Sequence, residues 1–149
     1  MTPPLPWGTR TFLMGILNIT PDSFSGDGLL VQEDVVAVAL ARARRFAAAG
    51  ADILDIGGES TRPGAQTISA EEELARVLPV VSAIAQSELN VLLSVDTSKA
   101  AVAEQVLRAG ADWINDVWAL RADPQLAEVA ARYKAPLVLM HNRSQPANA

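Results

Sequence analysis

The chain has 149 residues, half of them hydrophobic, and a formal net charge of −5. This length and composition predict one globular domain with a substantial core. Cysteine is absent, which excludes disulfides, thiolate metal sites and a cysteine nucleophile. The acidic balance argues against a nucleic-acid surface, and no apolar run approaches a membrane span or the apolar segment of a signal peptide. We therefore expect a cytoplasmic protein with neither nucleic acid nor membrane as a partner.

Short apolar segments bounded by glycine or polar residues predict buried strands, and they alternate with helical patterns. Strands are expected over 12–17, 53–56, 91–95, 113–117 and 136–140. Helices are expected over 33–49, from Ser69 to about 85, over 100–109, and from Asp123-Pro124 to about 133. Ser69 with Glu72 forms a capping-box pattern. Pro79 lies inside the second helix and predicts a kink or an early break there.

Five strands alternating with four helices predict an α/β fold with a parallel sheet and right-handed crossovers. Gly50 and Gly110 each close a helix just before a strand, in the same Ala-Gly-Ala-Asp context. Gly57-Gly58 is followed by Glu59, which is unlike the glycine fingerprint of dinucleotide-binding folds. A (β/α) TIM-type barrel fits better. Because a complete barrel has eight βα units, these 149 residues supply only about five.

Polar side chains lie at or near the carboxyl ends of all five predicted strands. They are Asn18, Asp55, Asp96, Asn115 and His141. Aspartate and asparagine at such positions often cap the next helix, so each residue alone has a structural interpretation. In a barrel, however, the carboxyl ends of the strands converge on one cavity. Five such positions in succession favour a binding site.

The residue types suggest what this cavity could bind. The carboxylate of Asp96 can accept from an amino group and a ring N–H together, and the amide of Asn115 offers a donor and an acceptor. This pair suits the edge of a heterocycle. Asn18 suits Mg²⁺ shared with substrate phosphates. Arg62 suits a phosphate or carboxylate, or is an ordinary solvated loop arginine. The role of the single histidine, His141, stays open.

The ordered segments of the chain resemble the dihydropteroate synthase family. The matching segments are MGILNITPDSFS (14–25), GGESTRPG (57–64), SVDTSK (94–99), INDV (114–117) and LMH (139–141). The resemblance covers residues 12–141. It implies a folate-pathway transferase on a TIM barrel that joins 6-hydroxymethyl-7,8-dihydropterin diphosphate to 4-aminobenzoate and releases diphosphate.

The resemblance also implies roles for individual residues. Asp96 and Asn115 would hold the pterin ring, with Asp55 at the floor of its pocket. Asn18 would bind magnesium, and residues 61–63 (Thr61, Arg62 and Pro63) would place diphosphate and 4-aminobenzoate. The roles of Asp22 and Ser23 are not determined. A complete barrel of this family would form a homodimer.

The chain differs from the family pattern at its carboxyl end. The family's last three strands carry an aspartate, a Ser-Arg-Lys segment and an Arg-x-His segment, and this chain has no counterpart of them. We therefore interpret residues 1–149 as a pterin-binding barrel domain seen as its first five strands. Two alternatives stay open. One is a non-catalytic pterin-binding or assembly module made of an incomplete barrel. The other is a reduced-folate methyltransferase, against which the Gly-Glu-Ser-Thr-Arg-Pro-Gly segment argues.

Overall fold

The computed structural model describes residues 5–20, 32–60 and 66–141. In this part of the chain, five strands form one parallel sheet in the order β1-β2-β3-β4-β5. The strands are β1 (Met14–Asn18), β2 (Ile53–Gly57), β3 (Leu92–Asp96), β4 (Trp113–Asp116) and β5 (Leu137–Leu139). The helices are α2 (Gln32–Ala48), α3 (Ala70–Ala85), α4 (Ala100–Arg108) and α5 (Gln125–Tyr133). The predicted α/β architecture is confirmed, with element ends shifted by one or two residues.

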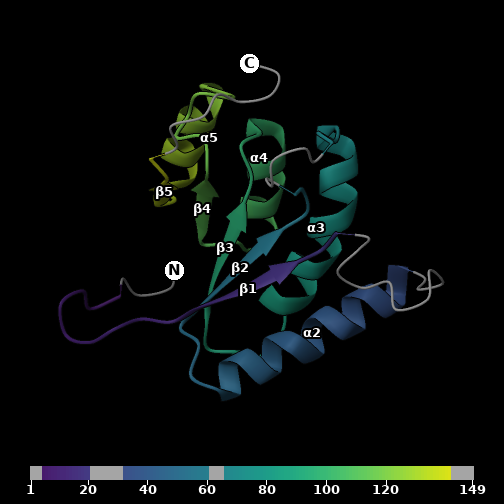
Figure 1. Cartoon of the computed structure of the whole chain (residues 1–149), viewed down its shortest axis with the longest axis vertical. Coiled ribbons are helices and arrows are strands. Elements are labelled where there is room, and N and C mark those ends of the chain that lie inside the picture. Colours follow the sequence, from purple (N-terminus) through teal and green to yellow (C-terminus); the bar gives the residue numbers. More distant parts are fainter. Residues whose placement is uncertain (1–4, 21–31, 61–65, 142–149) are drawn as a thin grey trace.

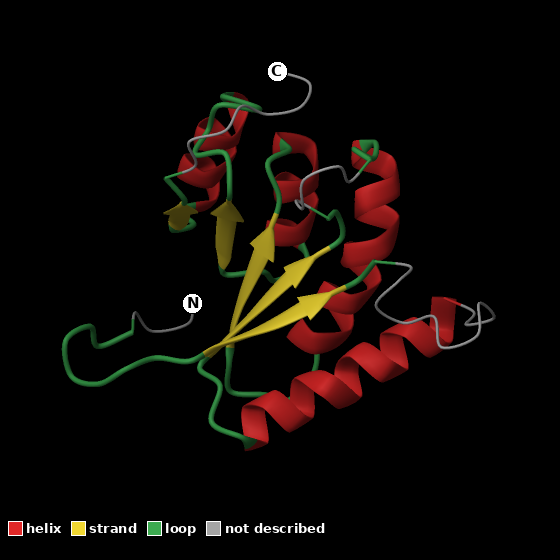
Figure 2. Ribbon diagram, in the orientation of Figure 1, coloured by secondary structure: helices red, strands yellow, loops and turns green. Residues whose placement is uncertain are grey.

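The four helices form a layer on one face of the sheet, whose strands fan out from a common region (Figures 1 and 2). Each helix packs against the next one along the chain, α2 on α3, α3 on α4 and α4 on α5. Gly15 shows how closely this layer approaches, because a Cβ there would lie 2.9 Å from the ring of Phe46 on α2. Within the described residues, the other face of the sheet carries no helix, and we call it the helix-free face.

Strand register places alternate residues on this helix-free face. Gly15 faces α2, so Met14, Ile16 and Asn18 face away from the helices, and all three are exposed. The register pairs Ile16 with Asp55, which pairs with Ser94 in turn. The helix-free face is therefore apolar at the amino ends of the strands and polar toward their carboxyl ends.

Helix ends follow the sequence pattern. The Ser69 hydroxyl accepts from the backbone N–H of Glu72 at 3.1 Å and caps α3 as predicted. Gly50 and Gly110 have φ values of +94° and +114°, a backbone conformation that glycine adopts without steric cost. An early break at Pro79 is not observed, because α3 continues through it to Ala85. Burial of apolar side chains on both sides of Pro79 offsets the missing backbone hydrogen bond.

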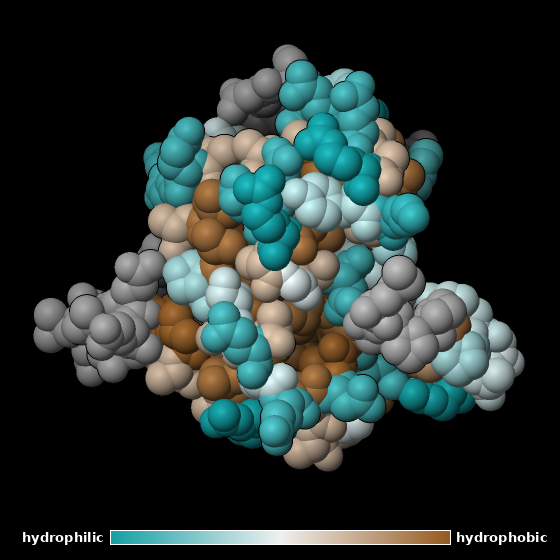
Figure 3. Space-filling model, turned by 180° about the vertical axis from the view of Figure 1, so that it is seen from behind, coloured by the Kyte–Doolittle hydropathy of each residue, from teal (hydrophilic) through white to brown (hydrophobic). Residues whose placement is uncertain are grey.

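Large apolar side chains are exposed mainly at the two edges of the sheet. Ile16 on β1 is 60% exposed and Leu139 on β5 is 49% exposed. Seen from behind, the surface has a hydrophobic area near its centre with hydrophilic residues around it (Figure 3).

Within the described residues, no helix is long and apolar enough to cross a membrane. The sheet is thus an open barrel segment whose edge strands lack neighbours in the described chain.

Candidate functional site

A row of polar residues crosses the helix-free face at the carboxyl ends of the strands. Asn18 pairs in register with Gly57, Gly57 with Asp96, and Asp96 with Asn115. Register partners on parallel strands point to the same face, so these side chains line one surface. Gly57 leaves a gap in the middle of the row. A Cβ at this position would lie 3.7 Å from Asn18 Oδ1 and 3.8 Å from Asp96 Oδ2.

A buried hydrogen-bond network lies one step below this row. Asp55 is 4% exposed. Its Oδ1 accepts from the hydroxyl of Ser94 at 2.6 Å, and its Oδ2 accepts from Nδ2 of Asn115 at 3.0 Å. The second of these bonds fixes the orientation of the Asn115 amide, because its NH₂ group points at Asp55. Asp55 therefore supports Asn115 from below, while Asp96 stands beside it on the neighbouring strand.

The electrostatic environment of Asp96 is unusual for an aspartate. Burial, followed by the charges of Asp55, Glu73, Asp116 and Glu59, raises the pKa of Asp96 to about 7. Within the described residues, no donor forms a hydrogen bond with its carboxylate. An acceptor that is desolvated, crowded by like charge and without a donor among the described residues is poised to bind a ligand that brings donors of its own.

Two side-chain oxygens in this row are candidate ligands for magnesium. Asn18 Oδ1 and Asp96 Oδ2 both face the gap at Gly57, and oxygen donors of this kind suit Mg²⁺. Among the described residues, no cluster of three or more His, Cys, Asp or Glu side chains could form a complete metal cage. The amide oxygen of Asn18 is the kind of single protein ligand that suits a magnesium ion taking its remaining ligands from substrate phosphates and water.

Two nearby aspartates follow the capping interpretation instead. Asp116 is fully buried, and its carboxylate accepts from the backbone N–H groups of Trp118 and Leu120 at 2.9 and 2.6 Å. Asp123 accepts from the N–H of Gln125 at 3.1 Å and from the N–H of Ala100 at 2.8 Å. Their carboxylates serve turns and helix starts, which distinguishes them from Asp96.

The structure does not describe every predicted site residue. Thr61, Arg62 and Pro63 lie outside the described residues, as do Asp22 and Ser23. His141 is exposed just beyond β5. The predicted pocket members Asn18, Asp55, Asp96 and Asn115 are brought together.

Sequence reasoning missed four residues at this end of the sheet. They are Ser94, Glu59, Glu73 and Lys99. Ser94 could have been found from its position two residues before Asp96, since i and i+2 share a strand face. The contacts of the other three depend on tertiary packing.

Comparison with known proteins identifies the group to which this arrangement belongs. Residues 14–149 match the family described as "Pterin binding enzyme". The chain is 48% identical to dihydropteroate synthase of Synechocystis sp. over 97% of this chain and 51% of the relative. It is 50% identical to dihydropteroate synthase of Bacillus subtilis over 95% of this chain and 48% of the relative. The chain thus spans about half the length of the curated relatives it matches.

Solved structures give the same picture. A dihydropteroate synthase from Clostridium difficile, solved in the presence of pteroic acid, superposes with a TM-score of 0.85 at 42% identity. The superposition covers 97% of this chain and 54% of that one. Dihydropteroate synthase of Xanthomonas albilineans with 4-aminobenzoic acid gives a TM-score of 0.81 at 48% identity, covering 91% of this chain and 48% of that one. The similarity is global within the residues compared.

Proposed function

The chain belongs to the pterin-binding enzyme family, and from this premise we propose that it performs the dihydropteroate synthase reaction of folate biosynthesis as part of a complete barrel. The substrates would be 6-hydroxymethyl-7,8-dihydropterin diphosphate and 4-aminobenzoate. In the reaction, the bond from the pterin methylene to the diphosphate oxygen breaks and a bond to the amine nitrogen forms. Diphosphate leaves, and the amine loses one proton.

The observation that carries this proposal is the pairing of Asp96 with Asn115. Asp96 offers a carboxylate without a donor in the described chain, and Asn115 offers an amide held in one orientation by Asp55. The carboxylate of Asp96 would accept hydrogen bonds from the amino group and the ring N–H of a pterin. The side-chain amide of Asn115 would form the remaining hydrogen bonds to the ring. When ionised, Asp96 would also stabilise positive charge that develops on the methylene as diphosphate leaves.

Asn18 is proposed as the protein ligand of the metal, with the carboxylate of Asp96 facing the same gap. When bound, Mg²⁺ would neutralise charge on the departing diphosphate. Thr61, Arg62 and Pro63 are proposed, on the strength of their motif, to contact diphosphate and 4-aminobenzoate. The amine of 4-aminobenzoate is an effective nucleophile without a strong base, so the chain's residues need only bind, orient and exclude water.

The exposed edges of the sheet support a proposal about domain organisation. Residues 1–149 would form the amino-terminal five strands of a pterin-binding barrel, with further strands pairing with β1 and β5. The exposure of Ile16 and Leu139 supports this, because apolar edge strands favour pairing. An intact mass of the natural protein well above 15.8 kDa would agree. The family resemblance supports the proposal that the complete barrel forms a homodimer. The cysteine-free sequence agrees with the proposal that the protein is cytoplasmic.

A matched pair of aspartate variants tests the function. Asp96→Asn removes the proposed pterin acceptor. Asp52→Asn makes the same change at the opposite end of the strands, where Asp52 binds Arg10 Nη1 at 2.9 Å. Two properties should be lost in Asp96→Asn and kept in Asp52→Asn. They are turnover of the two substrates with Mg²⁺ and binding of a pterin, measured by calorimetric titration. Pterin binding without turnover by the natural protein would favour the non-catalytic module. Absence of pterin binding would refute both readings.

A further inference from the structure

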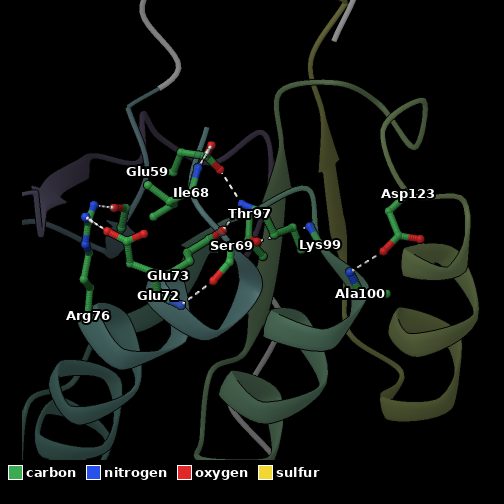
Figure 4. A network of polar contacts seen from close by, with 11 residues as sticks. Glu59, Ile68, Ser69, Glu72, Glu73, Arg76, Thr97, Lys99, Ala100 and Asp123 are labelled. Atoms are coloured by element: carbon green, nitrogen blue, oxygen red, sulfur yellow. Dashed lines mark hydrogen bonds and ion pairs between the residues drawn. The ribbon is translucent and has the colours of Figure 1, made fainter. Parts of the chain in front are cut away.

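An ion-pair cluster outside the polar row joins three elements at the carboxyl end of the sheet. Nζ of Lys99, between β3 and α4, pairs with Oε2 of Glu59 and with Oε2 of Glu73, the latter at 2.5 Å. Glu59 lies two residues beyond β2, and Glu73 lies in the first turn of α3 (Figure 4). One ammonium group thus connects the end of β2, the start of α3 and the segment that follows Asp96.

Glu59 also fixes the far end of the connection between β2 and α3. While its Oε2 pairs with Lys99, its Oε1 accepts from the backbone N–H of Ile68 at 3.1 Å. Residues 59 and 68 are therefore held together by one side chain. The adjacent carbonyl of Gly58 accepts from Nη1 of Arg76 on α3 at 2.8 Å. Both ends of the connection are tied to the rigid elements around them.

The energetics of the cluster argue against a purely stabilising role. Glu73 is 1% exposed, and its Oε1 has no hydrogen-bond partner among the described residues. Burial lowers the pKa of Lys99, but the hydrogen bonds that its ammonium group donates to Glu59 and Glu73 outweigh this effect and raise the pKa above its usual value. Ser69 already caps α3, so the helix does not need Glu73 at its start. Buried charge with an unpaired oxygen is costly, and an apolar side chain would pack at lower cost.

We propose that Glu59 and Lys99 are positioning residues that hold the two ends of the β2–α3 connection in register with Asp96, and that Glu73 anchors Lys99. This proposal rests on the proposed function. Lys99 lies three residues after Asp96 in the chain, and Glu59 comes two residues before Thr61. The cluster thus links Glu59 and Ile68, which flank the segment proposed to bind diphosphate and 4-aminobenzoate, to the residues that follow Asp96.

Amide hydrogen exchange tests the structural half of the proposal. Lys99→Met removes the shared charge at similar length. Glu59→Gln removes the ion pair but keeps an oxygen for the N–H of Ile68. Both should speed exchange over residues 60–68 by about tenfold, the effect of losing one charge-assisted hydrogen bond. Lys99→Arg should restore slow exchange. The control is Glu104→Gln, which makes the same side-chain change at a more exposed ion pair, that of Glu104 on α4 with Arg132 on α5 (2.9 Å).

Steady-state kinetics and titration test the positioning half in the natural full-length protein. In Glu59→Gln and Lys99→Met, we expect KM for 4-aminobenzoate to rise about tenfold, while affinity for a pterin without diphosphate changes less than about twofold. Lys99→Arg should recover KM. Unchanged exchange, or equal weakening of both ligands, would overturn the proposal. If the natural protein shows no turnover, the proposed function fails, and the exchange of residues 60–68 still decides whether the cluster holds the connection.

Discussion

Replacing Asp96 with asparagine should strengthen the fold while it weakens ligand binding. The pKa of Asp96 is raised from 3.8 to about 7, and one unit corresponds to about 1.4 kcal/mol. The ionised carboxylate therefore destabilises the folded state by at most about 4 kcal/mol, and by roughly 2–4 kcal/mol once partial exposure is considered. Asparagine has nearly the same shape without the charge, so its free energy of unfolding at about pH 8 should be higher by that amount.

The sign of the effect sets its pH window. The folded-state pKa of Asp96 lies above its unfolded value, so the protonated carboxyl imposes no charge penalty below about pH 4. The penalty grows as pH rises, because the unfolded chain ionises first, and it is complete above about pH 7. Between about pH 5 and pH 8, the advantage of Asp96→Asn should thus grow by about 2 kcal/mol.

Urea unfolding of both proteins across this range measures the stability change, and titration with a pterin measures binding. Loss of two hydrogen bonds to a charged acceptor should lower pterin affinity by at least about 100-fold in the variant. In the unmodified protein, affinity should fall as pH drops below about 7, because the protonated carboxyl accepts fewer hydrogen bonds. A stability difference that does not change with pH would refute the electrostatic reasoning. Unchanged pterin affinity in Asp96→Asn would refute the pocket assignment.

Further substitutions separate structural from binding roles. Asp55→Ala leaves the buried hydroxyl of Ser94 and the half-buried amide of Asn115 without their acceptor, so urea unfolding should show a loss of about 2–4 kcal/mol. In Gly57→Ala, the added Cβ meets no atom closer than 3.6 Å, so the melting temperature of this variant should stay within a few degrees of that of the unmodified protein. Its methyl group lies beside the proposed metal ligand and should reduce substrate binding in a titration. Gly58→Ala would place its Cβ 2.7 Å from Val77, so it should lose about 1–3 kcal/mol by the same unfolding assay; equal stability of the two alanine variants would contradict this. Asp123→Ala removes the acceptor at the start of α4 and should cost about 1 kcal/mol in urea, with pterin affinity unchanged.

Most of the fold could be predicted from the sequence because its signals are local. Apolar runs of strand length and helical spacing of apolar residues predicted every strand and helix of the described chain. Ser69 and the two helix-closing glycines also act within a few residues of themselves, which is why their roles were predicted. Of the kink or early break predicted at Pro79, the early break was wrong, because the burial that carries α3 past this residue comes from other elements.

The candidate site was predicted in part for the same reason. Strand ends are readable locally, and a parallel sheet brings them to one edge, so Asn18, Asp55, Asp96 and Asn115 were expected together. The prediction for Arg62 rests on its sequence motif alone, because Arg62 lies outside the described residues. Which strand-end aspartate only caps a turn, as Asp116 does, could not be read from the residue type.

The sequence by itself determined the alternation of strands and helices, the direction of the sheet and the family. Only the tertiary structure decided which polar groups meet. Asp55 and Asn115 are 60 residues apart in the chain and bonded in the fold, and Lys99 reaches Glu59 across 40 residues. The charge environment that raises the pKa of Asp96 depends on several such distant groups. Periodicity depends on residues that are close in the sequence, whereas burial and Coulomb interactions depend on residues that are close in space.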